Sequence, residues 1–477
     1  MGLRNMKLFL IGVGDKRRRQ VDAARELKKK HTIQYWTRQD DHFAMDESEF
    51  LGTVFHVYSD ALKGIPPKNI EISSFEPLSR DEIAAYAETE CEFMSMADKW
   101  YPDWPINKRK DLYYDMLRYW RGVLERFQPD CIILLGVPHE LFTFVLYWIA
   151  KRRDIRTIIL DNTVLDTDRY ILIDDYVVGS VTLAKAMEHV RSITIDELSP
   201  EMKAYYLRNS QSENPTPTLM REFNEDRAAL ENVRRFIRAS VAFIKDGTIV
   251  ERGVFKLLKM FKLSLKDEHL AVERPADFEK PYVYFPLHYQ PELTTSPLGG
   301  VYVDQLLAIK NTVAALPKGW EIYVKEHPAQ IAVHGGNATP ARYKGFYKSI
   351  AELPNTRLVP INTSTFKLID KARTTVTITG TAAWESILRG KPALVFGYPW
   401  FMHAPGIMQV RSVEDCRKAL TKIANGFALE KNDIFQYLQT IDRLSVKEYL
   451  YQSAPDREGE GIAMYRAIEA ALRSTAD

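Results

Sequence analysis

The run YVYFPLHYQPE, residues 282–292, passes from bulky strand-forming residues to a polar loop. The same change recurs at Lys325-Glu326-His327-Pro328 and at Thr379–Glu385. In a parallel sheet, the loops that follow the strands meet at the carboxyl edge, which is where ligands bind. We therefore expect three polar loops at one edge of one sheet, carried by neighbouring parallel strands. The predicted strands are Val283–Phe285, Ile322–Val324 and Val376–Ile378.

Strand and helix patterns alternate through both halves of the chain. In the first half they run from the strand Lys7–Gly12 to the strand Arg156–Leu160, and a second alternation runs from Tyr282–Phe285 to Ala393–Phe396. Such alternation predicts parallel strands covered by helices. The sequence therefore indicates an α/β protein with two Rossmann-like, doubly wound parallel sheets.

The length of 477 residues exceeds one ordinary core, and 45% hydrophobic with 27% charged residues is a globular composition. We place a first Rossmann-like domain at residues 1–270, with a helical insertion at about residues 182–270. A second Rossmann-like domain is placed at residues 271–440. Residues 441–477 are expected to form helices that pack back across the domain interface.

The net charge and the cysteine content limit which partners and which cellular compartment can be expected. Lys and Arg total 65 against 63 Asp and Glu, so the net charge of +2 gives no reason to expect nucleic acid. The three cysteines form no close pair, which excludes a disulfide framework and suits a reducing compartment. The apolar run Leu8–Val13 is too short for a signal peptide. We therefore expect a cytoplasmic protein.

The segment Lys325-Glu326-His327-Pro328 follows a predicted strand and ends in proline. The proline restrains its own backbone and that of the preceding residue, so His327 would be held stiffly beyond the strand. Its imidazole N–H can donate to a phosphate oxygen there, and Lys325 can add a positive charge. The alternative is a histidine that only satisfies a βα turn. Because companion motifs follow the neighbouring strands, we favour phosphate binding, with His327 also a candidate catalytic group.

Thr379-Gly380-Thr381 follows another predicted strand and precedes the predicted helix Ala383–Arg389. Its backbone amides and hydroxyls would lie at a helix N-terminus, where a phosphate is favoured. Glu385 lies one helical turn past Thr381 and can accept hydrogen bonds from two ribose hydroxyls. The alternative for Glu385 is a capping interaction with Thr381. The motif thus predicts one phosphate contact and one ribose contact.

The loop after Tyr282–Phe285 holds three further polar side chains, His288, Gln290 and Glu292. Loops in this position commonly carry function. Each of the three is a candidate contact for the sugar or the nucleotide of a nucleotide sugar. A hydrogen-bonded loop between the domains is an equally good interpretation, and the sequence leaves both open.

Two carboxylates of the first half also follow predicted strands. They are Glu140, after Cys131–Leu135, and Asp161, after Arg156–Leu160. A carboxylate near an anomeric carbon or an acceptor hydroxyl can act as base or nucleophile, so both are candidate catalytic groups. Glu140 can instead be a first-turn acid that stabilises a helix. Asp166-Thr167-Asp168 resembles a metal-binding Asp-x-Asp, but that pattern is common by chance, and we expect no metal.

Two basic features remain. Lys16–Arg19 and Lys28–Lys30 form an N-terminal patch, and the basic residues from Arg252 to Lys266 share one arc of a predicted helix whose opposite arc is apolar. This is the pattern of a helix that lies on an anionic membrane. It is equally the pattern of a surface helix packed on a core. The first interpretation predicts contact with the inner face of the cytoplasmic membrane.

With these residues in place, the chain resembles the bacterial capsule polysaccharide biosynthesis family, which includes the β-Kdo transferases of capsule and lipopolysaccharide assembly. The resemblance rests on Leu-His-x-Gln-Pro-Glu at 287–292, Lys-Glu-His-Pro at 325–328 and Thr-Gly-Thr-x-x-x-Glu-x-x-x-x-Gly-Lys-Pro at 379–392. It implies a GT-B architecture, two Rossmann-like domains facing a cleft, with the nucleotide in the C-terminal domain and the acceptor on the N-terminal one. It also implies that His327 contacts the donor phosphate. The Asp/Glu-Asp/Glu-Gly element of bacterial sialyltransferases is absent, so the resemblance assigns no catalytic carboxylate.

The function that the resemblance implies is a metal-independent glycosyltransferase. It would transfer a Kdo-like or other acidic sugar from a CMP-linked donor to a glycan or glycolipid acceptor, without a further cofactor. The alternatives are a polyol-phosphate transferase or a nucleotide-sugar epimerase on the same fold. A non-catalytic scaffold of capsule assembly is a third alternative.

Overall fold

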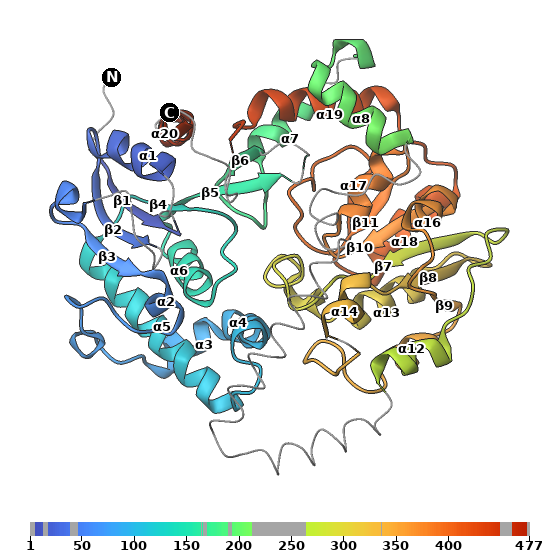
Figure 1. The fold of residues 1–477 in the computed structure, drawn as a ribbon, viewed down its shortest axis with the longest axis horizontal. Helices are drawn as coiled ribbons and strands as arrows, with labels where there is room; N and C mark the ends of the chain where they lie inside the picture. The colour runs from blue at the N-terminus through green and yellow to red at the C-terminus, as the bar shows by residue number, and fades with distance from the viewer. Residues whose placement is uncertain are drawn as a thin grey trace, which may run out of the picture.

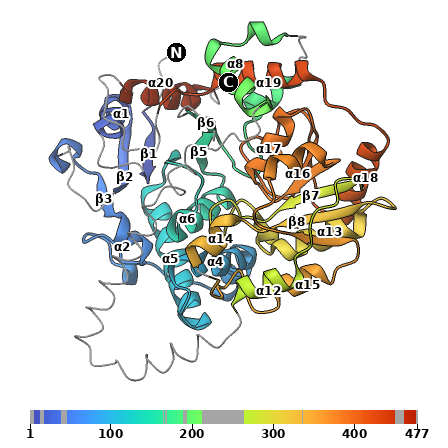
Figure 2. The same cartoon turned by 45° about the vertical axis from the view of Figure 1, so that its right-hand side comes forward.

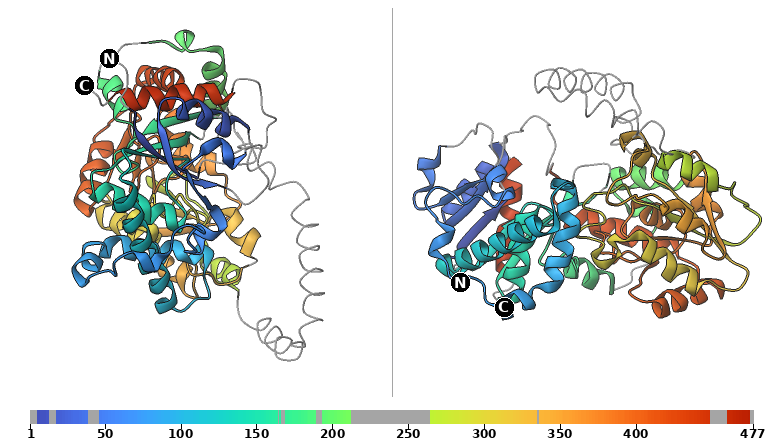
Figure 3. Two further views of the ribbon diagram at one scale, coloured as in Figure 1. Left: turned by 90° about the vertical axis from the view of Figure 1, so that its left-hand side faces the viewer. Right: turned by 90° about the horizontal axis from the view of Figure 1, so that it is seen from below.

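Two six-stranded sheets form the frame of the molecule (Figure 1). The computed structural model describes residues 5–12, 18–38, 46–163, 165, 169–188, 193–211, 264–334, 336–448 and 460–474. The first sheet, blue to green, and the second, yellow to orange, lie side by side when seen from below (Figure 3).

The first sheet has the strand order β3-β2-β1-β4-β5-β6. Its pairs are parallel except for β5 and β6, which run antiparallel. β4 is buried along its whole length because helices cover both faces of a doubly wound sheet. The strands are β1 (Lys7–Ile11), β2 (Thr32–Arg38), β3 (Val54–Val57), β4 (Cys131–Leu134), β5 (Arg156–Thr163) and β6 (Arg169–Ile173).

The second sheet has the order β12-β11-β10-β7-β8-β9, and its pairs are all parallel. β7 pairs with β8 from Tyr282↔Glu321 to Pro286↔Lys325, and with β10 on its other side. The three strands expected to be neighbours are therefore neighbours. The strands are β7 (Tyr282–Pro286), β8 (Glu321–Lys325), β9 (Thr356–Val359), β10 (Thr374–Thr377), β11 (Ala393–Val395) and β12 (Ile407–Gln409).

Both sheets follow the Rossmann strand order, because numbering each sheet along the chain gives 3-2-1-4-5-6 in both. The predicted fold, two Rossmann-like α/β units of the GT-B kind, is confirmed. The strand order reverses between β1 and β4 in the first sheet and between β7 and β10 in the second. Ligands of such sheets bind at this switch point, outside the carboxyl ends of the strands.

Helices flank both sheets (Figures 1 and 2). Local sequence signals fix several helix ends, such as the reciprocal capping of Ser79 and Glu82 at the start of α3. In the first half the helices are α1 (Arg18–Lys28), η1 (Glu47–Phe50), α2 (Tyr58–Leu62), η2 (Ile72–Ser74), α3 (Arg80–Ala85), α4 (Ala87–Trp100), α5 (Ile106–Phe127), α6 (Leu141–Arg152), α7 (Val181–Glu188), η3 (Ile195–Glu197) and α8 (Pro200–Gln211). In the second half they are α12 (Leu265–Val272), η4 (Gly300–Val303), α13 (Gln305–Ala315), α14 (Pro328–His334), α15 (Phe346–Ala351), α16 (Thr365–Lys371), α17 (Thr381–Leu388), α18 (Val413–Ala424), α19 (Lys431–Leu444) and α20 (Glu460–Arg473).

Two differences from the sequence-based expectation concern candidate site residues or their neighbours. β6 was not predicted, and it pairs with β5 so that Asp161 lies opposite Ile171, inside the strand pair instead of beyond its end. The sequence pattern predicts a helix over Ala341–Leu353, but in the structure this helix, α15, begins only at Phe346. Arg342 lies before that helix in an isolated bridge with Thr339, so the chain reaches α15 through an irregular segment.

One hydrophobic cluster joins the two halves of the molecule. It holds Phe142 and Tyr147 of α6 together with Trp384 of α17 and the buried Phe401. Trp384 also donates through its indole Nε1 to the Tyr205 hydroxyl of α8 at 2.8 Å. The halves are therefore packed against each other and share a core.

The C-terminal helices reach back to the first half. α20 packs along α1, and the Glu469 carboxylate lies 3.1 Å from His31 Nε2 (Figure 2). α19 contacts α7 and α8, and it runs across the domain boundary placed at residue 440. The domain boundaries stay predictions.

Several sequence-based expectations lie outside the described residues. Residues 212–263 of the expected insertion are among them, and so is nearly all of the basic helix expected at Arg252–Lys266. Lys16 and Arg17 of the N-terminal patch also lie outside. In the part of the chain that the structure covers, no helix is both long enough and apolar enough to cross a membrane.

Gly461 provides a test of how closely α20 docks. A β-carbon at this position would lie 2.3 Å from the Arg19 carbonyl oxygen and 2.9 Å from the Asp22 β-carbon. Gly461→Ala should therefore lower the free energy of unfolding by about 1–3 kcal/mol, measured by urea denaturation. Ala463→Ser, on the exposed side of the same helix, is the control and should change it by less than about 0.5 kcal/mol. A G461A protein as stable as the wild type would exclude the close docking.

Candidate functional site

The carboxyl ends of β7, β8 and β10 bring together most of the residues predicted for a nucleotide site. Lys325 ends β8, and His327 lies two residues beyond it. Glu385 reaches the same region from α17, close enough for its charge to act on Lys325. The ring centroid of Tyr289, which follows β7, lies 6.1 Å from that of His327. A β-carbon on Gly380, which follows β10, would lie 3.3 Å from His288 Cε1. Three separate loops therefore converge at the switch point of the second sheet.

His327 is held with one nitrogen free. Its Nδ1 accepts the backbone N–H of Ala329 at 3.2 Å, so the neutral ring carries its proton on Nε2. Within the described residues, Nε2 has no hydrogen-bond partner. Burial lowers the pKa of His327, and the Lys325 charge acts in the same direction. At neutral pH this histidine is therefore an uncharged N–H donor available to a ligand.

Lys325 is a buried cation beside that donor. Its Nζ donates to the Thr365 hydroxyl at 2.7 Å, and the residue is 6% exposed. Burial lowers the pKa of Lys325 to about 8, while the Glu385 charge opposes this shift. The amine is therefore mostly protonated at neutral pH, and it is poorly screened by water.

Glu385 is only weakly engaged within the protein. Its Oε1 lies 3.4 Å from the Thr381 hydroxyl, and burial raises the pKa of Glu385 to about 7. The N-cap of α17 is Gly380, whose position carries no side-chain cap, so Glu385 does not complete a capping box. The capping alternative is therefore the weaker one, and the carboxyl group keeps acceptors for a ligand.

His288 has a different role from the expected ligand contact. Its Nε2 lies 2.9 Å from the Thr377 hydroxyl and 3.3 Å from the Thr379 backbone nitrogen. Its Nδ1 lies 3.3 Å from the Thr294 hydroxyl. Both ring nitrogens are thus occupied, and burial lowers the pKa of His288 to about 3. His288 joins the turns that follow β7 and β10 and leaves no nitrogen for a phosphate.

Gln290 and Glu292 also depart from the expectation of ligand contacts. Gln290 is 4% exposed, and its amide oxygen accepts from Gln305 Nε2 at 2.5 Å and from Arg342 Nη1 at 2.8 Å. Glu292 points to the other half of the molecule, where its Oε2 lies 3.8 Å from the Lys99 Nζ of α4. The alternative of a hydrogen-bonded loop between the domains describes both residues better.

Arg342 and Glu326 are parts of the site that sequence reasoning missed. They form a fully buried ion pair, with Arg342 Nε 2.7 Å from Glu326 Oε2. Glu326 stood inside a quoted motif, and a carboxylate between an apolar strand and a proline is a signal that a buried cation is required. The identity of that cation could not be read, because the sequence pattern placed Arg342 in a helix that in fact begins only at Phe346.

The two carboxylates of the first half differ in their surroundings. Glu140 caps α6, accepting from the Thr143 hydroxyl at 3.1 Å, and its Oε1 lies 3.2 Å from His139 Nε2. Asp161 has neither a hydrogen bond nor an ion pair through its side chain in the described part of the chain. Burial raises the pKa of Asp161 to about 7. Of the two carboxylates, Asp161 is therefore the one that no protein group engages within the described residues.

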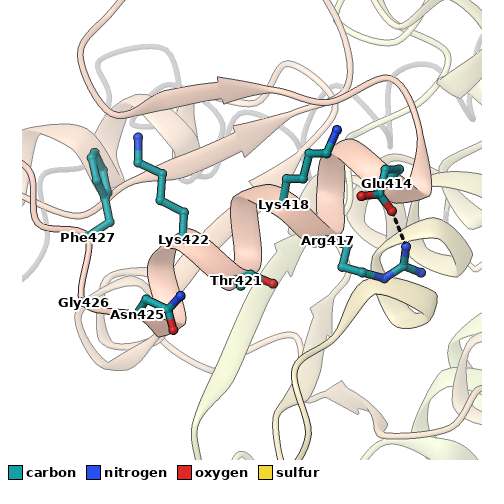
Figure 4. Close-up of a pocket in the computed structure, with 8 residues that line it drawn as sticks. All are labelled: Glu414, Arg417, Lys418, Thr421, Lys422, Asn425, Gly426 and Phe427. Atoms are coloured by element: carbon teal, nitrogen blue, oxygen red, sulfur yellow. Dashed lines mark hydrogen bonds and ion pairs between the residues drawn. The ribbon is translucent and has the colours of Figure 1, made fainter.

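A surface hollow of about 730 Å³ lies elsewhere, on α18 and the turn after it (Figure 4). Figure 4 shows Glu414 paired with Arg417, and Lys418 and Lys422 extended from the same helix. We assign it no role, because one helix and one turn line it and no motif contributes. Among the described residues, no group of three or more His, Cys, Asp or Glu side chains could hold a metal ion, and Asp166–Asp168 lie outside them.

The second half matches a known family. Residues 295–437 match the model of the family described as capsule polysaccharide biosynthesis protein. The family resemblance is confirmed. The segment of this chain that matches the family model contains Lys325, His327, Thr379–Thr381 and Glu385. The residues His288, Gln290 and Glu292 precede that segment. No curated protein matches the chain by sequence at a significant level.

Solved structures show distant likenesses to this chain. The UDP-GlcNAc 2-epimerase of Neisseria meningitidis, bound to UDP-GlcNAc, is 13% identical with a TM-score of 0.25, covering 98% of this chain and 100% of that one. The β-Kdo 2,4-transferase of Thermosulfurimonas dismutans is 11% identical with a TM-score of 0.30, covering 65% and 87%. The β-Kdo 2,7-transferase of the same organism is 11% identical with a TM-score of 0.28, covering 67% and 79%. The fold assignment made here rests on the strand order of the two sheets.

The raised pKa of Glu385 predicts a loss of stability as the pH rises. The folded-state value of about 7 lies above the ordinary 4.5, so the folded protein binds the extra proton between these values. The corresponding stability is complete below about pH 4.5 and is lost as the pH rises through about 7, by at most about 3 kcal/mol. Glu385→Gln should remove this part of the pH dependence. Urea unfolding at about pH 5 and about pH 7.5 measures it.

The control for this prediction is Glu352→Gln, because the Glu352 side chain is 66% exposed. This variant should keep the pH dependence of the wild type. If the free energy of unfolding changed equally between the two pH values in E385Q and in the wild type, the burial of the Glu385 carboxyl group would be contradicted.

Proposed function

We propose that this protein is a glycosyltransferase of bacterial surface polysaccharide assembly. It transfers a Kdo-like or other acidic sugar from a CMP-linked donor to a glycan or glycolipid acceptor. One observation carries the proposal: Lys325, His327 and Glu385 converge at the carboxyl edge of a Rossmann-like sheet, inside the segment that matches the capsule family. No further cofactor takes part in the proposed reaction.

The charges at this edge favour a donor with one phosphate. His327 contributes an uncharged N–H, and Lys325 contributes one cation. Arg342, the other cation nearby, is neutralised by Glu326. The partly ionised Glu385 offsets the Lys325 charge in part. A single phosphodiester therefore suits this edge better than a diphosphate, which brings a second negative charge without a partner here. This balance supports a CMP-linked donor over a UDP-linked one.

The remaining groups suit the nucleoside and the leaving phosphate. The N-terminus of α17 offers the backbone amides after Gly380 to the phosphate, and His327 Nε2 donates to the same group. Glu385 accepts hydrogen bonds from the ribose hydroxyls. As the bond between the anomeric carbon and the phosphate oxygen breaks, these donors stabilise the negative charge that develops on the CMP oxygen.

Asp161 supplies the base in this proposal. The acceptor hydroxyl gives its proton to the Asp161 carboxylate while its oxygen forms the new bond to the anomeric carbon and CMP departs. A pKa of about 7 suits this role, because the group is partly ionised at neutral pH and is still basic enough to take a proton. Glu140, already engaged by His139 and Thr143, is the second choice.

The donor role predicts that CMP stabilises the protein against heat. His327→Ala should weaken CMP binding by about 1.5–3 kcal/mol, because one hydrogen bond to a charged phosphate is lost. Thermal-shift titration with CMP, UDP, GDP and CDP ligands measures this and identifies the base. His334→Ala, which removes a nearby histidine stacked on Tyr289, is the control and should leave the CMP shift in place. An unchanged shift in H327A would remove the phosphate role of His327.

The same assays separate the alternative functions. Product formed from the donor alone, without acceptor, would indicate a nucleotide-sugar epimerase. Transfer of a polyol phosphate to the acceptor in place of a sugar would indicate the polyol-phosphate transferase. Binding of glycan without binding of any nucleotide at millimolar concentration would favour a scaffold.

The proposed role of Asp161 as the base predicts a loss of kcat in one variant and a specific pH dependence of kcat/KM in the wild type. Asp161→Asn should lower kcat by about 10²–10⁴-fold, because the acceptor proton loses its base, with CMP binding unchanged. In the wild type, kcat/KM should rise with pH to a plateau above about 7, where the carboxyl group is ionised. Glu140→Gln is the matched control, with a smaller expected loss. Should E140Q lose the activity and D161N keep it, the two assignments would be exchanged.

A further inference from the structure

Glu326 is the residue of Lys-Glu-His-Pro whose charged side chain makes no contact with a ligand in the proposed function. It is 0% exposed, and its partner Arg342 is 1% exposed. A buried ion pair is weak evidence for stability, since apolar residues of similar volume often stabilise a protein equally well. The role of this pair is therefore sought in the groups that it holds in place.

The guanidinium of Arg342 reaches two of the three converging loops. Its Nε lies 2.7 Å from Glu326 Oε2, in the loop after β8. Its Nη2 donates to the His288 carbonyl oxygen at 3.0 Å, and its Nη1 to the Gln290 side-chain oxygen at 2.8 Å, both in the loop after β7. The rigid fork of an arginine fixes the direction of each of these bonds. One side chain thus sets the distance between two strand-end loops.

Glu326 passes this constraint to His327. Its Oε1 accepts the backbone N–H of His327 at 2.6 Å, while its Oε2 also accepts the Tyr347 hydroxyl at 2.8 Å. In the loop after β7, the Gln305 Oε1 accepts the His288 backbone N–H at 2.7 Å. Both histidine-bearing turns are therefore tied through their backbones to the same buried arginine.

We propose that Arg342 is a positioning residue for nucleotide binding: through Glu326 and the His288 carbonyl it holds the loop bearing His327 in register with the loop that follows β7. Arg342 does not touch the ligand in this proposal, because its guanidinium is enclosed by protein groups. The inference rests on the proposed nucleotide site. It adds a residue that neither the motifs nor the proposed chemistry identified.

A positioning role and a merely structural role predict different behaviour for an apolar replacement of the pair. The double variant Glu326→Leu/Arg342→Met should regain much of the stability that Arg342→Met alone loses, because no charge is left buried without a partner. CMP binding should nevertheless stay at least about tenfold weaker than in the wild type, because the loop bearing His327 is no longer held in register. Calorimetric titration with CMP measures the affinity, and urea unfolding measures the stability.

Two further variants complete the experiment. Arg121→Met is the matched control, because Arg121 is a 7% exposed arginine paired with Glu82 in the other half, and CMP affinity should change by less than about twofold. Arg342→Lys keeps the charge but not the fork, so it should bind CMP as weakly as Arg342→Met. Wild-type affinity in R342K would show that charge alone suffices and would overturn the proposal. Wild-type affinity in the double variant would overturn it as well.

A ligand-free measurement separates this proposal from the proposed function. The imidazole NMR signals of His288 and His327 should move in the double variant and stay in place in R121M. If wild-type protein bound no nucleotide, the proposed donor would fail, and these signals alone would decide on the positioning role. Unmoved imidazole signals in the double variant would overturn that role, whatever the outcome with CMP.

Discussion

The pairing of β7 with β8 on one side and β10 on the other is the constraint on which the candidate site depends. All three strands run in the same direction, so the loops after them leave the sheet at one edge. Both faces of these strands are buried, which confines polar side chains to the strand ends. An antiparallel β8 would carry His327 to the opposite edge, and the three motifs would never meet.

Burial determines the protonation states of the ionisable groups at the carboxyl edge of the second sheet. The same loss of water that lowers the pKa of Lys325 and His327 raises that of Glu385. Each group is pushed towards its neutral form, and each opposite charge nearby pulls it back only in part. The site consequently offers directional hydrogen bonds with little net charge. Such a surface suits a ligand that carries few charges and many oxygens able to pair with these donors and acceptors.

The fold and the meeting of three strand-end loops at one sheet edge were predictable, because strand patterns and the loops after them repeat along the chain. The direction of each polar side chain was not. His288 and Gln290 stand in a strand-end loop just as His327 does, yet their polar atoms are taken up by Thr377, Gln305 and Arg342. These partners lie 15–89 residues away in sequence. β6 was missed although its pairing with β5 is local, with paired residues only 6 to 14 positions apart, and although Arg169–Ile173 is itself rich in strand-forming residues.

The alternation of side chains along β8 explains why Lys325 and Glu326, which are adjacent in Lys-Glu-His-Pro, have different surroundings. Successive residues of a strand point to opposite faces, so Tyr323 and Lys325 share one face while Val324 and Glu326 share the other. Lys325 accordingly meets Thr365 of α16, and Glu326 meets Tyr347 of α15 and the nearby Arg342. The period of the strand thus places Lys325, which faces the proposed nucleotide site, and Glu326, which anchors the loop, on opposite faces of the sheet. Two adjacent charges with opposite signs avoid neutralising each other because the sheet lies between them.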